Sequence, residues 1–464
     1  MPNLLSTVGV IDMLNWKRFF SLAVSICLML SCMPVPAYSV QDNWTYRQTG
    51  NTGAVITCTG GIDSAVVEAP ALASAVVSGD TVTVTGTDGA VGVASVWVTS
   101  AGETRLFEVP LGYTTFAFED NCLIVYPGTD TNYEITGVNA DDEAFAVGDE
   151  TYPLVTGADS RGNPVYYNTE DYSLYVSIAK KGGTYVFTGT GEDMAIAVKK
   201  EATKPATLLL CNLDLTSSFT APITVKKNSS STVTITALAG MESTLTDVEF
   251  NNADLYGDPT DDGGDGTNVE YAESAVIKGK DYANVTMNGN GTLNLNCATK
   301  NAVKIGEYGN LTLEDLTLNV TTARNGLSSD NTLTIHSGTY NITSAADGIR
   351  TDPDVVGADI GCAGNIIIED GMFLITSGSD CIQAAQDLTV SGGVFYLKAG
   401  AGWDDTAFDK DTMSCKGLKA SGNLDETDET AVATNMLTIT GGCFNINSAD
   451  DSIHSDCDIT ITGG

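Results

Sequence analysis

One stretch of the chain decides the fold: Asn325-Gly326-Leu327-Ser328, then Leu333-Thr334-Ile335, then Gly338-Thr339-Tyr340-Asn341-Ile342, after which Asp347-Gly348-Ile349-Arg350 begins the series again. The repeat is 22 residues long, measured from the leucine of the first segment to the isoleucine of the last. Three strands of three to five residues with turns between them occupy about that length. A unit this small cannot bury its own apolar face, but stacked units can, if each strand pairs in parallel with its copy about 4.8 Å away. The repeat therefore predicts a parallel β-helix.

Copies of these segments extend through the C-terminal half of the chain. The aliphatic position of the first segment and the apolar position of the glycine-led segment are expected to form two continuous inward rows. The first row is Val303, Leu327, Ile349, Ile382, Leu418 and Ile453, and the second is Leu293, Leu318, Tyr340, Phe373, Phe395 and Phe444. Because the pattern has no helical periodicity of useful length, alternating βα units fit it poorly.

The segments outside the regular repeat define the expected domains. Residues 183–464 are predicted to be the β-helix, with less regular early coils and a C-terminal end that stops inside a coil. Residues 40–137 contain short apolar runs between Gly and Asp turns without the 22-residue period, which predicts a small antiparallel β domain, sandwich-like in form. Residues 138–182 are expected to be a linker or a cap. The fold class is therefore all-β throughout.

The first 37 residues have the pattern of a signal peptide. Lys17-Arg18 precede the apolar run Phe19–Leu30, and Val35-Pro36-Ala37 is typical of a cleavage site. The run is shorter than the roughly 20 residues that span a bilayer, and no other stretch approaches that length, so we expect no transmembrane segment in the mature chain. The prediction is a secreted or cell-surface protein. Cys32, in Leu30-Ser31-Cys32, is the alternative, a lipid anchor.

Composition excludes several classes of partner. The chain has 59 acidic and 22 basic residues among 464, a formal charge of −37, which would repel nucleic acid. A hydrophobic content of 42% is too high for a disordered acidic tail. Two histidines, His336 and His454, cannot make a multi-histidine metal site, whereas abundant carboxylates suit Ca²⁺.

The residue after each inward aliphatic position is expected to point outward, and here the scarce cations gather. These residues are Lys304, Ser328, Arg350, Gln383, Lys419 and His454. Donors repeated at the strand spacing can follow a linear polymer, so Lys304, Arg350, Gln383, Lys419 and His454 are candidate carbohydrate-binding residues. The alternative is that outward positions on a strand are polar in any case, and both interpretations stay open.

Acidic residues mark the turn that enters the same strand. Asp347, Asp380, Asp450 and Asp451 are candidate metal ligands, because carboxylates stacked on neighbouring coils repel one another unless a cation such as Ca²⁺ lies between them. The alternative is purely local turn chemistry, since Asp and Asn bond nearby backbone N–H groups. Three acidic insertions also interrupt the coils: Asp254–Asn268, which lacks the ligand pattern of an EF-hand, Asp352–Asp359 and Asp404–Asp428.

Several motifs together resemble a known family. Thr244–Asp247, Glu273–Lys278, Gly289–Leu293, Asp347–Arg350 and Asp380–Ala384 follow the order seen in the exported bacterial carbohydrate-binding β-helix domain, related in fold to polysaccharide lyases. The resemblance implies a right-handed β-helix, Ca²⁺ held by turn aspartates, and binding of plant cell-wall polysaccharide, including acidic pectin-like chains. It brings no demonstrated lyase activity. Lys416 stands where an Asp would, which puts a calcium site in that coil in doubt.

Three functions remain possible on the sequence alone. The first is calcium-dependent polysaccharide binding at the cell surface or after secretion. The second is a lyase that cleaves uronates by β-elimination, for which Arg350, Lys416 or Lys419 would be the base and Ca²⁺ would acidify the proton. The third is a structural surface protein or adhesin. No nucleophile motif is present, so no catalytic residue is assigned.

Overall fold

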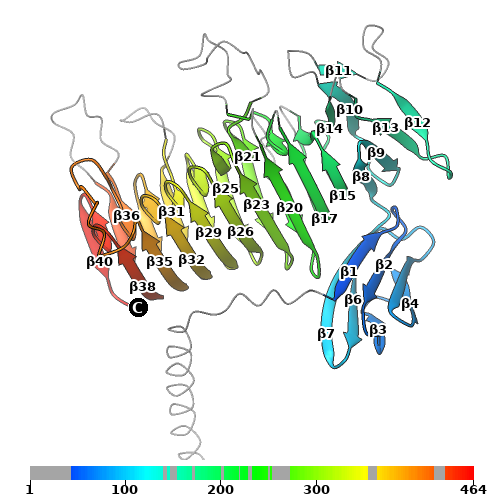
Figure 1. Cartoon of the computed structure of the whole chain (residues 1–464), viewed down its shortest axis with the longest axis horizontal. Coiled ribbons are helices and arrows are strands. Elements are labelled where there is room, and N and C mark those ends of the chain that lie inside the picture. Colours follow the sequence, from blue (N-terminus) through cyan, green and yellow to red (C-terminus); the bar gives the residue numbers. More distant parts are fainter. Residues whose placement is uncertain are drawn as a thin grey trace, which may run out of the picture. The chain divides into compact units, whose positions relative to one another are not determined.

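The computed structural model describes residues 43–138, 144–146, 154–169, 173–199, 203–218, 220–227, 232–248, 251–252, 272–353, 363–422 and 434–464. These residues form strands and turns and no helix (Figure 1). The predicted signal peptide, the possible anchor at Cys32 and the acidic insertion at 254–268 lie outside the described residues.

Two small antiparallel sheets form the start of the described chain. One has the strand order β1-β2-β5-β4 and the other β3-β6-β7, and together they bury one apolar cluster that includes Ile56, Val96 and Phe107. Their strands are β1 (Trp44–Gln48), β2 (Gly53–Cys58), β3 (Ser64–Val67), β4 (Ala73–Ser78), β5 (Thr81–Gly86), β6 (Gly92–Ser100) and β7 (Glu103–Leu111). The expected small antiparallel β region, which precedes the β-helix in the chain, is confirmed.

The sheets of the β-helix begin earlier in the chain than residue 183. Strand β8 (Thr114–Asp120) pairs in parallel with β15 (Gly183–Glu192) and antiparallel with β9 (Cys122–Tyr126). β12 (Thr156–Ala158) and β13 (Pro164–Tyr167) continue this edge. Pairing of this kind satisfies the backbone groups of the first coil, which an open edge would leave exposed. Residues 114–126 thus lie in a β-helix sheet, although the sequence placed them in the small domain; the other domain limits stay predictions.

The first strands of the coils form one sheet of 12 strands. Its parallel members are β14 (Ser173–Ile178), β16 (Met194–Val198), β18 (Ile223–Val225), β21 (Ala275–Gly279), β24 (Asn301–Ile305), β27 (Leu327–Ser329), β30 (Ile349–Arg350), β33 (Ile382–Ala384), β36 (Leu418–Ala420) and β39 (Ile453–Ser455). β10 (Tyr133–Val138) and β11 (Ala144–Ala146) extend it antiparallel at the N-terminal end.

The second and third strands of the coils belong to a sheet of 21 strands, together with β15 and the long β17 (Ala206–Ser217). The second strands are β19 (Thr232–Ala237), β22 (Asn284–Asn288), β25 (Asn310–Glu314), β28 (Thr332–Ile335), β31 (Asn365–Ile368), β34 (Leu388–Val390), β37 (Met436–Ile439) and β40 (Asp458–Ile461). The third strands are β20 (Glu242–Asp247), β23 (Thr292–Cys297), β26 (Thr317–Thr322), β29 (Thr339–Ser344), β32 (Met372–Ser377), β35 (Val394–Ala399) and β38 (Cys443–Ser448).

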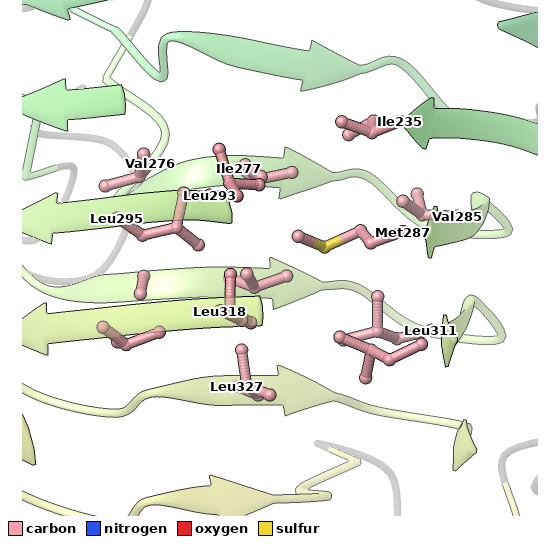
Figure 2. Packing of buried hydrophobic residues seen from close by; sticks show 14 of the residues in the cluster. Ile235, Val276, Ile277, Val285, Met287, Leu293, Leu295, Leu311, Leu318 and Leu327 are labelled. Carbon is pink, nitrogen blue, oxygen red and sulfur yellow. The ribbon is translucent and has the colours of Figure 1, made fainter. Parts of the chain in front are cut away.

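Both predicted inward rows are confirmed by the strand register. In the first row each aliphatic residue pairs with its copy in the next coil, from Val303 to Ile453. The second row contains a stack of aromatic rings, with centroids 4.6 Å apart between Phe373 and Phe395. Figure 2 shows part of this core, where Leu293, Leu318 and Leu327 point into the same interior.

Glycine is required for steric reasons at two positions of the first segment, Gly326 and Gly348. A Cβ on Gly326 would lie 2.3 Å from the carbonyl oxygen of Gly348 in the next coil, and one on Gly348 would lie 2.6 Å from that of Cys381. Consecutive coils therefore approach one another closely at this turn. The small residue before each inward aliphatic position is what permits the spacing.

Replacing Phe373 by Ala should open a cavity in the aromatic stack, because the ring is fully buried. We expect a loss of about 3–5 kcal/mol in the free energy of unfolding, measured by urea denaturation. Met372→Ala, next to it in β32 but exposed, is the control and should change stability by about 0.5 kcal/mol or less. Equal effects of the two changes would contradict the inward and outward assignment.

Candidate carbohydrate-binding faces

The structure brings the predicted outward residues of the first strands into one row. Register pairs join each member to the next. In order they are Lys304, Ser328, Arg350, Gln383, Lys419 and His454. Lys278 of β21 pairs with Lys304 and extends the row by one coil. The row is therefore a real feature of the fold, whatever its function.

Three cations of this row form ion pairs with carboxylates of the protein. Lys304 lies 2.5 Å from Asp330, Arg350 lies 2.9 Å from Asp347, and Lys419 lies 3.2 Å from Asp380. The exposed fraction of these three basic side chains is only 15–22%. Removing one partner of such a pair would leave a poorly solvated charge. The three side chains thus neutralise the turn acids, which leaves them little capacity to bind a polymer.

Two further members of the row, Gln383 and His454, also have partners. Gln383 donates to the hydroxyl of Ser421 over 3.3 Å. His454 lies between two carboxylates, with Nδ1 3.1 Å from Asp451 and Nε2 2.8 Å from Asp456. The side chain of His454 is 30% exposed and is more open than those of Lys304, Arg350 and Lys419.

The Asn and Asp side chains of the entry turn form a ladder of hydrogen bonds between coils. Asn325 Oδ1 accepts the backbone N–H of Asp347 over 3.2 Å, and Asp347 Oδ1 accepts that of Asp380 over 3.0 Å. Asp380 Oδ1 in turn accepts the N–H of Lys416 over 2.7 Å. Burial raises the pKa of Asp347, and the neighbouring Arg350 opposes the shift. Each carboxylate thus satisfies a backbone donor of the next coil.

Calcium does not fit these aspartates in the arrangement described. The other oxygen of Asp347 meets Arg350, Asp380 meets Lys419 and Ser414, and Asp450 meets Lys416. An ion placed there would face a guanidinium or ammonium group at short range. Within the described ranges there is no group of three or more His, Cys, Asp or Glu side chains that could hold a metal. Calcium binding to this chain stays a prediction.

Sequence reasoning about sites missed Lys278. The sequence contains the signal for it, because Lys278 directly follows the inward aliphatic residue Ile277, as Lys304 follows Val303. Burial lowers the pKa of Lys278 to about 8, aided by the charges of Lys304 and Lys280 and opposed by Glu273. Lys280 is itself 2.7 Å from Glu273. The ammonium of Lys278 therefore loses its proton more readily than that of a lysine in water.

The outward faces of the second and third strands carry mainly amides and hydroxyls, with a few charged residues such as Glu242, Glu314 and Lys398. Thr234, Thr286, Thr312 and Thr334 follow one another in register on the second strands. A hollow of about 320 Å³ opens on this face, lined by Thr232, Asn284, Val285, Thr286, Asn310, Thr312, Thr332 and Thr334. On the third strands Asn294, Asn319 and Asn341 are joined by amide hydrogen bonds of 2.8 Å. Sequence reasoning did not propose these residues, although their recurrence was visible.

The part of the chain that carries these faces matches a known protein family. A family model described as "carbohydrate-binding domain-containing protein" matches residues 173–464. Because the match covers more than half of the chain, this protein belongs to that family of carbohydrate-binding domain proteins, as its motifs predicted.

The curated proteins contain no match to the chain. Among solved structures it is similar to one titled "Structure of the polysaccharide lyase-like protein from C. thermocellum, Gadolinium derivative", with 19% identity and a TM-score of 0.38. That similarity covers 75% of this chain and 96% of the other. No helix of the described part is long and apolar enough to cross a membrane.

Asp380→Ala should destabilise the protein strongly, because it leaves the N–H of Lys416 and the ammonium of Lys419 without their partner. We expect a loss of about 3–5 kcal/mol in the free energy of unfolding, equal in calcium and in chelator. Asp380→Asn, which keeps an acceptor oxygen, should lose less. A calcium-dependent rise in the wild-type melting temperature that Asp380→Ala abolishes would instead identify Asp380 as a metal ligand.

Lys278→Met should raise the melting temperature near neutral pH, because a charged ammonium that is partly removed from water costs free energy. In the unfolded state the pKa of a lysine is about 10.4. Between about 8 and 10.4 the unfolded state binds more protons, so wild-type stability rises with pH and the advantage of the variant should shrink. Differential scanning calorimetry of both proteins across this range measures the difference. Lys398→Met, on the exposed side of β35, is the control; an advantage that does not vary with pH would contradict burial of a charge at Lys278.

Proposed function

We propose that this protein is exported and binds plant cell-wall polysaccharide, at the cell surface or after secretion, without converting it. Its membership of a carbohydrate-binding family supports binding to a glycan. Export is supported by the sequence of residues 1–37 alone. Calcium dependence, which the family resemblance implies, is not required by this proposal.

The observation that carries the proposal is the regular array of uncharged polar side chains on the second and third strands. Threonine hydroxyls and asparagine amides are repeated from coil to coil at about 4.8 Å, the spacing of paired strands. Each offers both donor and acceptor groups, as sugar hydroxyls do. A linear polysaccharide is therefore met by similar groups along its whole length, instead of by one deep pocket.

The lyase alternative lacks a free base among the residues first considered for it. Arg350, Lys416 and Lys419 each form an ion pair with a carboxylate of the protein. Lys278 is the lysine whose pKa would suit proton abstraction, and it gives the alternative a direct test.

The purified chain, from residue 38 on, should be retained by at least one insoluble plant polysaccharide and release no unsaturated product. The panel is cellulose, insoluble xylan and calcium-crosslinked polygalacturonate, with soluble polygalacturonate in calcium or in chelator for the enzyme assay. Retention is measured by depletion from solution, and cleavage by ultraviolet absorbance. Absence of retention on every glycan would overturn the proposal. Growth of absorbance that Lys278→Met abolishes would replace it with the lyase function.

A further inference from the structure

The outward side of the third strands, which we call the third-strand face, contains no carboxylate from β23 to β38. Its residues are Thr292, Asn294, Asn296, Thr317, Asn319, Thr321, Thr339, Asn341, Thr343, Met372, Leu374, Thr376, Val394, Tyr396, Lys398, Cys443, Asn445 and Asn447. Lys398 is its one charged residue. In a chain with 59 acidic residues, this face stands out by its neutrality.

Two adjacent coils replace the polar residues of this face by apolar ones. Met372 is 50% exposed and Leu374 is 54% exposed. In the next coil Val394 pairs with Met372, and Tyr396 pairs with Leu374. These four side chains, which we call the apolar patch, therefore lie side by side on the outside of the sheet. Apolar groups exposed together on a soluble protein are typical of a binding surface.

Amide groups border the apolar patch on both sides. Asn341 pairs with Leu374 in the preceding coil, and Asn445 pairs with Tyr396 in the following one. The amide ladder of Asn294, Asn319 and Asn341 ends there, because leucine cannot continue it. The side-chain oxygen of Asn341 is thus left beside the apolar patch, where it can accept a hydrogen bond from a ligand.

An exposed tryptophan lies at the border of the same face. The backbone N–H of Trp403 donates to the side-chain oxygen of Asn447 over 2.8 Å, and Asn447 pairs with Lys398 on the third-strand face. The preceding Gly402 has a φ of +102° and no room for a Cβ, which would lie 2.6 Å from Asn447. The backbone of Trp403 is therefore held, while its side chain is 80% exposed.

We propose that the third-strand face binds a neutral, linear polysaccharide, which lies across the coils over the apolar patch. A pyranose ring has C–H groups on its faces and hydroxyls around its edge. The apolar patch and Trp403 match the C–H faces, and the flanking asparagines match the hydroxyls. From β23 to β38 the face is roughly 24 Å long, enough for several sugar units. This inference rests on the proposed function and names the ligand class and the face.

Charge favours a neutral ligand over a pectin-like one. A polyuronate would approach a protein of formal charge −37 against long-range repulsion. Lys304, Arg350 and Lys419, which might hold it, are paired with carboxylates of the protein. A neutral chain meets no such barrier. The third-strand face offers it contacts without the cost of desolvating an ion.

The test compares a double variant, Leu374→Thr with Tyr396→Thr, with the control Val76→Thr. Threonine is the residue at many equivalent outward positions, so the fold should persist, which the melting temperature checks. Val76 is 65% exposed on β4, in a small antiparallel sheet that contains none of the second or third strands, so this change removes an exposed apolar group from elsewhere on the molecule. The wild type should bind cellulose or xylan with an affinity that changes little between low and high salt. The double variant should lose about tenfold or more in affinity, and the control within about twofold. Trp403→Ala should also weaken binding.

The outcomes separate this inference from the proposed function. Wild-type protein that binds no glycan would overturn both. If the double variant is folded and binds a neutral glycan as tightly as the wild type does, the inference alone is overturned. Retention only on polygalacturonate, abolished by salt, would also overturn it. Light scattering measures the mass of both proteins, and a dimer that the double variant dissociates without change in glycan affinity would assign the apolar patch to a second copy of this chain.

Discussion

Every coil of this protein is fixed by the parallel pairing of its strands with those of the next coil. The register persists from coil to coil, as from Leu327 to Ile349 to Ile382. Equivalent side chains therefore lie directly above one another, about 4.8 Å apart. Apolar side chains gain from this arrangement, and aromatic rings stack. Charged side chains of one sign lose from it, because stacked like charges repel.

The turn acids show how the molecule manages that repulsion. Asp347 and Asp380 lie in adjacent coils, and each accepts a backbone N–H from the next coil while pairing with a cation of the outward row. Arg350 and Lys419 are therefore used to stabilise the stack. A fold that places scarce cations against its own buried acids has few left for an acidic ligand, which shifts attention to uncharged surfaces.

The neutral faces acquire their importance from this distribution of charge. Most of the acid lies in turns and insertions, so the outward sides of the third strands remain free of carboxylates from β23 to β38. Regular pairing then repeats whatever side chain the position carries, and asparagine gives the amide ladder from Asn294 to Asn341. In two adjacent coils the pattern changes: Met372, Leu374 and their partners Val394 and Tyr396 replace polar residues. This change makes part of a polar face apolar.

The sequence alone determined the coil, its inward rows and the alignment of the outward row, because a strand alternates its side chains and a short repeat can bury its core only by stacking. It also identified the family from ordered motifs. Only the tertiary structure decided which charged side chains pair with one another. Whether Arg350 faces a ligand or Asp347, and whether Asp380 holds an ion or Lys419, depends on distances between turns and strands that no spacing in the chain specifies. The same holds for the exposure of Leu374 and Trp403, since a periodic pattern tells which way a residue points but not what covers it.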